Sequence, residues 1–341
     1  MSAAIPLIRA GAIVPIERWL LANGRPAAAW LREVDLPPEP HRDVMRPLAL
    51  HAVLNFLMLV QEREGPDIGC RVVTSQSILD LDVLAGPVLT SATPRCALNR
   101  IASIYPRHSS HEIFYLAGDD TGVSIHGSFA MKMPLDTAPE AAHVAHQYLV
   151  MLALSLCRTE TPDEPLPVSI KITPHPRHGL DHLVPWFGAD IAASASCELV
   201  ATFPNALLDR QLPWYSSDVL PLRNSHAGDR VGARSLAESA RILIDFMIEE
   251  GEPSIDRLAA AAGRSRRTMQ RMLAAEDTSF ADLLDQVRYH RALAQIAEGD
   301  VAVADIAREL GDSNPSSLTR AVRRWTDESP RNLRRHVRRG N

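Results

Sequence analysis

The chain has 341 residues, 46% of them hydrophobic, and a formal net charge of −5. This length is sufficient for two domains, each with its own hydrophobic core. A net acidic charge by itself argues against a nucleic-acid partner. The charge is uneven, however, because residues 230–341 hold 19 arginines against 17 acidic residues, whereas the remainder holds 17 basic and 24 acidic residues. This asymmetry predicts a phosphate-binding surface on the C-terminal part and an acidic surface on the rest.

Several protein classes lack support in the sequence. Its four cysteines are far apart and form no CxxC pair, which indicates free thiols in a reducing compartment. No apolar run approaches the roughly 20 residues that a membrane span requires, and no GxSxG, Walker, GxGxxG or HExxH motif occurs. We therefore expect a cytoplasmic protein that does not bind a membrane, has no catalytic residues and needs no cofactor.

Residues 1–215 alternate between helical and strand patterns, which predicts a mixed α/β domain. A hairpin is expected where two short apolar runs flank Gly-Asp-Asp-Thr-Gly. The predicted helices are Pro15–Gly24, Pro47–Arg63 and Glu140–Arg158, and the predicted strands are 113–116, 123–128, 167–172 and 197–203.

Residues 216–235 are rich in Ser, Gly, Pro and Arg, which is typical of an interdomain linker. The next helical pattern, Leu236–Glu250, is expected to bury Leu243, Ile244, Met247 and Ile248. We expect it to open an all-α domain that covers residues 236–341.

A helix-turn-helix pattern follows. A capped helix begins near Ile255 and breaks at Gly263, and a second helix begins at Ser265. This second helix places Met269, Met272 and Leu273 on one face and its polar residues on the other, as a DNA recognition helix does. Arginine runs are also common on solvated helices. In the DNA-binding interpretation, Arg267, Gln270 and Arg271 contact bases, and Arg266 contacts phosphate.

A second unit of the same kind follows a long helical pattern. That pattern runs for about 19 residues from Thr278 towards Gly299, or about 28 Å at the rise of an α-helix, which approaches the roughly 34 to 36 Å of one DNA turn. The second unit comprises 303–310 and a helix that begins at Pro315. Its expected docking residues are Leu318, Ala321, Val322 and Trp325. We expect Ser316, Ser317 and Arg320 to face the groove, and Arg323 and Arg324 to hold phosphates.

The whole C-terminal stretch resembles the DNA-binding domain of AraC-family transcription regulators, in which a long helix joins two helix-turn-helix units. The resemblance rests on Leu258-Ala259, Ser265 to Leu273, Thr278-Ser279-Phe280, Val287-Arg288, Asp305-Ile306-Ala307, Leu310-Gly311, Thr319-Arg320-Ala321, Arg324-Trp325 and Ser329-Pro330. The chain departs from the family at Asp277, where a glycine is usual, and at Asp312, Leu318 and Val322, where aromatics are usual. Because these changes thin the packing of the second unit or its turn, we expect the first unit to contribute more of the sequence recognition.

The N-terminal part resembles the ligand-binding domain of one branch of the same regulators. The matching residues are Ile68-Gly69, Ile172-Thr173-Pro174-His175-Pro176, Trp186-Phe187-Gly188-Ala189 and Phe203 to Pro213. The resemblance implies an α+β protein: a mixed effector-binding and dimerisation domain followed by the all-α domain. It implies a homodimer that binds double-stranded DNA and a small-molecule effector, and that contacts RNA polymerase if it is an activator, the role we favour. The apolar helix Glu140–Arg158 is a candidate dimer contact.

Other patterns suggest alternative functions. His175, His178, Asp181 and His182, or His143 with His146, have spacings compatible with a metal, although spacing alone does not close a coordination shell. Arg230 and Arg234 have the RxxxR spacing of PilZ-type cyclic-dinucleotide receptors, and Ser124 begins a partial SxxG. The same arginines also suit a basic linker near DNA. Two broader alternatives are an enzyme with a fused regulatory tail and a module that binds RNA or an acidic protein.

Overall fold

The computed structural model describes most of the chain and divides it into two compact units. The described residues are 4–119, 122–129, 138–157, 166–214, 231–251, 253–298, 301–310, 315–326, 328–330 and 332. One unit is Pro6–Gly232, and the other combines Ala233–Asn341 with Met1–Ile5. Within the second unit, the Ile5 amide donates a 2.9 Å hydrogen bond to Ser239 Oγ.

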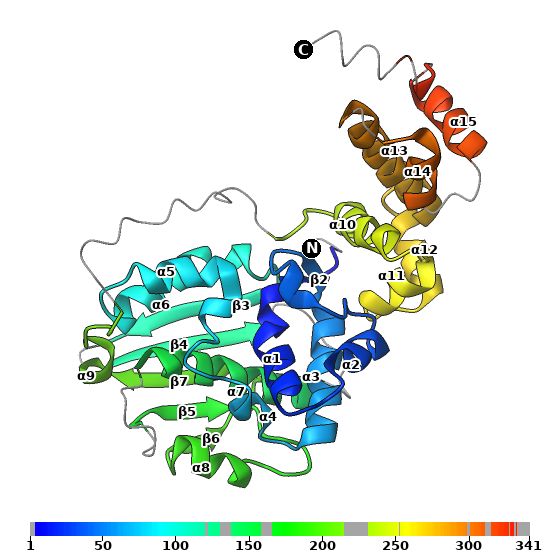
Figure 1. Ribbon diagram of the computed structural model, residues 1–341. Coiled ribbons are helices and arrows are strands. Elements are labelled where there is room, and N and C mark those ends of the chain that lie inside the picture. The colour runs from blue at the N-terminus through cyan, green and yellow to red at the C-terminus, as the bar shows by residue number, and fades with distance from the viewer. Residues whose placement is uncertain are drawn as a thin grey trace. The chain divides into compact units, whose positions relative to one another are not determined.

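The Pro6–Gly232 unit mixes helices with two sheets (Figure 1). Its helices are α1 (Val14–Ala22), α2 (Ala27–Glu33), α3 (Leu50–Glu64), α4 (Ile68–Arg71), α5 (Ala85–Leu89), α6 (Pro94–Ile104), α7 (Ala138–Cys157), α8 (Val184–Phe187) and α9 (Asn205–Leu208), with short 3-10 turns η1 (Ala10–Ile13), η2 (Pro40–Arg42), η3 (Leu79–Leu84), η4 (Tyr105–Arg107) and η5 (Asp181–Leu183). Its strands are β1 (Leu7–Arg9), β2 (Pro47–Ala49), β3 (Glu112–Gly118), β4 (Gly122–Phe129), β5 (Ser169–Ile172), β6 (Ile191–Ala193) and β7 (Leu199–Pro204).

The larger sheet has the order β3-β4-β7-β5-β6, and only β5 and β6 are parallel. The predicted hairpin is confirmed as β3 and β4, with Tyr115 opposite His126. Side chains alternate along the strands, so that Ile125, Phe203 and Ile170 are buried while Tyr115 and Lys171 point towards solvent. One face of this sheet therefore supports the hydrophobic core.

Helix α7 forms the centre of that core. All residues from Ala141 to Tyr148 are buried, and the helix contacts α3 and α4 as well as β5 and α6. The expected dimer contact through Glu140–Arg158 is therefore wrong for the described part of this helix, because its surface is already covered by its own domain. An apolar helix that lacks a polar face belongs inside a domain.

The start of the predicted helix Pro47–Arg63 also needs correction. Pro47–Ala49 forms β2, paired antiparallel with β1, and the helix begins at Leu50. The strand exists because a segment some 40 positions earlier in the chain lies beside it, with Ile8 opposite Leu48. Helical periodicity alone does not contain that information.

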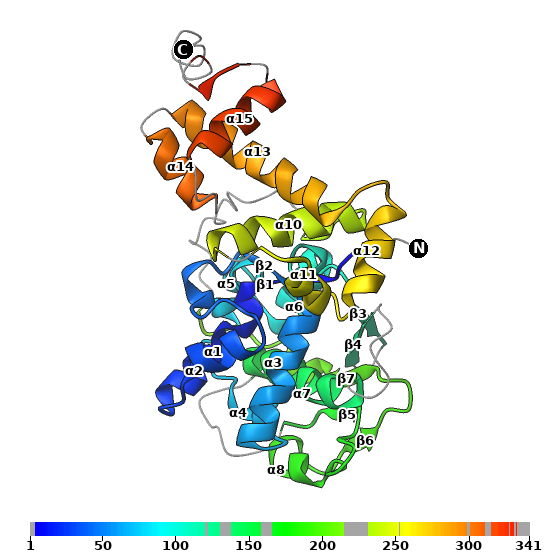
Figure 2. The ribbon, with the colours of Figure 1, turned by 90° about the vertical axis from the view of Figure 1, so that its right-hand side faces the viewer.

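The second unit consists of the helices predicted from the sequence. They are α10 (Leu236–Glu249), α11 (Ile255–Ala261), α12 (Arg266–Ala274), α13 (Phe280–Glu298), α14 (Val303–Glu309) and α15 (Pro315–Thr326). Figure 2 shows α13 as the long helix between α12 and α14. The hydroxyls of Ser235, Ser254 and Ser265 cap α10, α11 and α12 at their N-termini. The predicted buried residues of α10, Leu243, Ile244, Met247 and Ile248, are confirmed.

The turn after α12 explains one departure from the family pattern. Asp277 has φ of +53°, in the left-handed region that glycine adopts most easily. Aspartate is among the few other residues that tolerate this conformation. The substitution therefore strains the turn without breaking it.

Gly69 is predicted to be essential for the packing of α4 on α7. A Cβ at this position would lie 2.7 Å from Gln147 Cβ and 2.7 Å from the Val144 carbonyl oxygen. We expect Gly69→Ala to lower the free energy of unfolding by about 1 to 3 kcal/mol through overpacking, measured by urea denaturation. Gly127→Ala is the matched control, because its Cβ would approach Leu199 no closer than 3.5 Å. Equal stability losses in both variants would contradict this explanation.

Candidate functional site

Helix α12 has the two faces expected of a recognition helix. The Ser265 hydroxyl accepts a 3.3 Å hydrogen bond from the Thr268 amide and fixes the start of the helix. Met269 and Leu273 are completely buried against the unit, whereas Arg267, Gln270 and Arg271 are exposed. Arg266 lies 3.1 Å from Asp256 in an exposed ion pair. The helix can therefore present guanidinium and amide groups to a ligand without losing its packing.

Helix α15 is docked on α13 through buried apolar residues and one aspartate. Leu318 and Val322 are buried, as predicted, and Arg320 and Arg323 are exposed. Asp285 on α13 accepts hydrogen bonds from Arg324 at 2.8 and 2.9 Å and from Trp325 Nε1 at 3.0 Å. An exposed ion pair of this kind contributes little stability, so Arg324 can exchange Asp285 for a phosphate. The side chains of Ser316 and Ser317 lie outside the described residues.

Arginines also tie α13 to its neighbours. Arg291 forms ion pairs with Asp245 and with Glu249, the latter at 2.6 Å, and these two carboxylates raise its pKa. Arg288 Nε donates a 3.1 Å hydrogen bond to the Leu310 carbonyl at the end of α14. These contacts anchor α13 to α10 and to α14, and thereby connect the two helix-turn-helix units.

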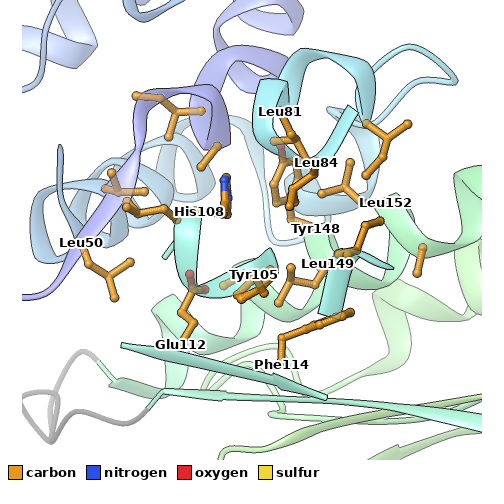
Figure 3. A pocket seen from close by; sticks show the side chains of 18 of the residues that line it. Leu50, Leu81, Leu84, Tyr105, His108, Glu112, Phe114, Tyr148, Leu149 and Leu152 are labelled. Carbon is orange, nitrogen blue, oxygen red and sulfur yellow. The ribbon is translucent and has the colours of Figure 1, made fainter. Parts of the chain in front are cut away.

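The Pro6–Gly232 unit contains a cavity of about 70 Å³ between its helices and β3 (Figure 3). Most of its wall is apolar. The lining residues are Ile8, Ala12, Ile13, Leu50, Val53, Leu54, Leu57, Ile78, Leu81, Leu84, Leu98, Ile101, Tyr105, His108, Glu112, Phe114, Ala145, Tyr148, Leu149, Leu152, Ala153 and Leu156. A mostly apolar cavity with a few polar groups is the usual form of a small-molecule site.

Four polar side chains interrupt this apolar wall: Tyr105, His108, Glu112 and Tyr148. Burial lowers the pKa of His108 to about 4, with Arg9 adding to the effect, so its imidazole is neutral near pH 7. Burial also raises the pKa of Glu112, although Ser109 and Tyr105 offset part of the rise. The pKa values of both tyrosines are raised by burial as well. The cavity therefore favours uncharged forms of its own polar groups.

The sequence did not identify these residues. Tyr105 begins η4, His108 follows that turn and Glu112 begins β3, whereas Tyr148 lies within the apolar pattern of α7. A tyrosine inside an otherwise apolar helix can indicate a polar group in a binding cavity. The same pattern equally fits a tyrosine whose hydroxyl reaches solvent at the surface. Only the tertiary fold brings these four side chains to one cavity.

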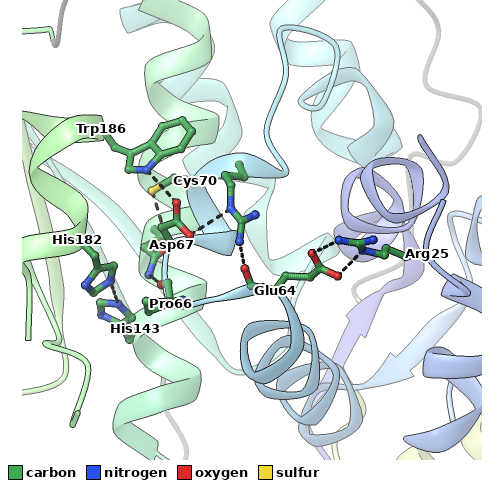
Figure 4. Close-up of polar contacts among 10 residues, drawn as sticks. Arg25, Glu64, Pro66, Asp67, Cys70, His143, His182 and Trp186 are labelled. Atoms are coloured by element: carbon green, nitrogen blue, oxygen red, sulfur yellow. Dashed lines mark hydrogen bonds and ion pairs between the residues drawn. The ribbon is translucent and has the colours of Figure 1, made fainter. Parts of the chain in front are cut away.

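Four of the histidines considered as metal ligands, His143, His175, His178 and His182, have rings that lie close to one another. Figure 4 shows His143 of α7 beside His182 of η5. His143 Nε2 lies 3.0 Å from His182 Nε2, and the His175 ring lies 5.3 Å from that of His143. No group of three or more His, Cys, Asp or Glu residues in the described part of the chain is arranged to hold a metal. Hydrogen bonds to protein groups account for His143 instead, because its Nδ1 lies 2.7 Å from the Thr173 carbonyl oxygen.

A polar network beside these histidines joins α3, α4, α7 and α8. Asp67 accepts from Trp186 Nε1 at 3.3 Å and pairs with Arg71 at 3.1 Å, and Gln147 Nε2 donates to the Pro66 carbonyl at 2.7 Å. Figure 4 shows these contacts following one another across the turn between α3 and α4. The network thus holds that turn against α7 and gives Trp186, one of the residues matched in the sequence, a hydrogen bond to Asp67.

The residues suggested for a cyclic dinucleotide are only partly described. Ser124 lies on β4, and its hydroxyl is 2.8 Å from Thr202 Oγ1 on β7. Arg234 precedes α10, and its amide donates to Glu238 at 2.7 Å. Arg230 and most of the predicted linker, residues 216–230, lie outside the described residues. The cyclic-dinucleotide hypothesis stays a prediction.

Comparison with protein families gives one match for the N-terminal part of the chain and one for the C-terminal part. The arabinose-binding domain found at the N-terminus of AraC transcription regulators matches residues 24–212, more than half of the chain. A helix-turn-helix domain family matches residues 258–336. The chain therefore belongs to the AraC family of transcription regulators, which is a family of DNA-binding proteins rather than enzymes.

Individual relatives match over part of their length. The chain is 26% identical to the transcriptional regulator VqsM of Pseudomonas aeruginosa over 47% of this chain and 51% of that protein. It is 33% identical to the regulator VirS of Mycobacterium tuberculosis over 29% of each chain. The crystal structure of the regulator CdpR from Pseudomonas aeruginosa aligns over 92% of this chain and 98% of its own, with 20% identity and a TM-score of 0.41.

No helix among the described residues is both long and apolar enough to cross a membrane.

Buried histidines predict that stability falls in mild acid. Burial lowers the pKa of His143 and His108 to about 4 and that of His146 to about 3, from 6.5. Between about pH 6.5 and 4 the unfolded chain therefore binds more protons, and the free energy of unfolding should fall by up to about 1.4 kcal/mol per pH unit for each histidine. Urea denaturation at pH 7.5, 6.5 and 5.5 measures this slope.

The variant His143→Gln should flatten the slope, since it removes one of these protons. His290→Gln is the control, because His290 is exposed on α13. An unchanged slope in His143→Gln would refute the assignment.

Proposed function

We propose that this protein is a sequence-specific DNA-binding transcription regulator, controlled by a small molecule that binds in the cavity of the Pro6–Gly232 unit. The observation that carries the DNA-binding part is the exposure of Arg267, Gln270 and Arg271 on a capped helix anchored by two fully buried residues. The cavity, with its few polar groups in an apolar wall, supports the effector part.

In this proposal α12 enters one major groove and α15 enters another. Arg267, Gln270 and Arg271 contact base edges, since guanidinium and amide groups form paired hydrogen bonds with guanine and adenine. Arg320 contacts the second groove together with Ser316 and Ser317, and Arg266, Arg323 and Arg324 hold phosphates. We further propose a cytoplasmic homodimer that activates transcription through RNA polymerase.

The two classes of arginine give different results when they are removed. Arg271→Ala should weaken binding to a preferred duplex by about 1 to 3 kcal/mol and relax the preference at a local set of base pairs. Arg323→Ala should weaken binding to all duplexes about equally and reduce the slope of affinity against salt by about one charge. Fluorescence anisotropy with duplexes selected from a random pool, and with single-base variants of them, measures both effects.

Arg42→Ala is the control, because Arg42 is an exposed arginine of the other unit. Equal losses on every duplex for Arg271→Ala and Arg323→Ala would refute the division into base and phosphate contacts. Binding without any preference among duplexes, or stronger binding to RNA or to an acidic protein, would refute the regulator itself and favour the binding-module alternative.

A further inference from the structure

Three of the polar residues that line the cavity each have a buried side-chain atom with no hydrogen-bond partner in the described part of the chain. Among the described residues, nothing forms a hydrogen bond with Glu112 Oε2, His108 Nδ1 or the Tyr148 hydroxyl, although each atom is shielded from solvent. A buried polar atom without a partner costs about 1 to 3 kcal/mol, and such atoms are rare. All three belong to residues that line the same cavity, and Figure 3 shows Glu112, His108 and Tyr148 among its leucines. A ligand that bonded to them would recover this cost.

We infer that the effector is an uncharged, largely apolar small molecule with one hydrogen-bonding end, such as an alcohol, ketone or amide, and that this end contacts Glu112, His108 and Tyr148. The inference rests on the proposed function, since it names the ligand class of the proposed effector site. The apolar part of the molecule contacts the leucine, isoleucine and valine side chains that form most of the wall.

The composition of the wall argues against a sugar, despite the name of the domain family. A sugar carries a hydroxyl on nearly every carbon, and each hydroxyl needs a partner when it is buried. The wall offers four polar side chains, set among 18 apolar ones. Most hydroxyls of a sugar would face Leu, Ile or Val, at a cost that the few available hydrogen bonds do not offset.

The wall also argues against a charged ligand. It contains no lysine or arginine to balance the charge of a carboxylate, and a carboxylate buried there would meet the same desolvation cost that raises the pKa of Glu112. The nearby cation, Arg9, is outside the wall and donates to the carbonyls of Met45 at 2.6 Å and Arg107 at 3.2 Å. A bound amine would need Glu112 ionised, whereas burial favours the neutral acid. A neutral head group avoids both penalties.

The test compares probes with the same alkyl chain and different head groups. Octan-1-ol, octanoate, octylamine and arabinose are titrated into the full-length protein by isothermal titration calorimetry, with thermal unfolding as a second measurement. We expect saturable binding of octan-1-ol with a negative heat-capacity change and a rise in melting temperature. Octanoate, octylamine and arabinose should bind at least tenfold more weakly.

Three variants place the binding at the cavity. Ala153→Leu fills part of it and should abolish octan-1-ol binding. Tyr148→Phe removes one hydroxyl and should weaken binding about threefold to tenfold. Glu112→Gln should bind octan-1-ol about as tightly as the wild type, because an amide donates and accepts as a neutral acid does. Tyr115→Phe is the control, since Tyr115 is exposed on β3 and absent from the wall.

The outcomes separate this inference from the proposed function. Tighter binding of octanoate, octylamine or arabinose that Ala153→Leu abolishes would overturn the ligand class and leave the effector site in place. Loss of octan-1-ol binding in Glu112→Gln would also overturn it, because a charged carboxylate would then be required. If no probe binds, the inference fails. The binding of selected duplexes by the same proteins tests the regulator independently.

Discussion

The burial of α7 is the constraint on which the rest of the Pro6–Gly232 unit depends. Eight consecutive residues, Ala141 to Tyr148, are buried, so the helix needs protein on every side of two full turns. Helices α3 and α4 and the sheet supply it. Because His143, His146 and Gln147 lie in this stretch, their polar atoms must also find partners inside the fold. His143 Nδ1 and His146 Nδ1 pair with the carbonyl and the amide of Thr173, and Gln147 Nε2 donates to the Pro66 carbonyl. These bonds hold the Thr173 and Pro66 loops against the helix.

The same helix also sets the position of the cavity. Where α4 meets α7, Gly69 brings the two backbones so close together that no side chain fits at this position. Along the same helix, Ala145 and Ala153 are small, and the large side chains around them do not fill the volume. Tyr148 lines the same volume, and its buried hydroxyl has no hydrogen-bond partner in the part of the chain that the structure describes. Close packing at one part of α7 and a cavity beside another follow from the sizes of the residues on its different faces.

How much the sequence predicts depends on the range of the interactions involved. The helices of the second unit were predicted nearly to the residue, because caps such as Ser265 and stripes such as Met269 with Leu273 are local features. The dimer contact assigned to α7 was wrong because an apolar helix fits an interface and a core equally well. The cavity was not predicted at all, since Glu112 and Tyr148 come to line one cavity only through the packing of β3 against helices.

The net charge of the second unit understates how positive its proposed DNA-binding face is. Residues 230–341 carry only two more arginines than acidic residues, but several of those acids are used inside the unit. Asp245 and Glu249 pair with Arg291, and Asp285 holds Arg324 and Trp325. Residues 264–275, by contrast, include four arginines and no acid. These three acids thus dock one helix on another, and α12 keeps a concentrated positive charge that a count over the whole domain conceals.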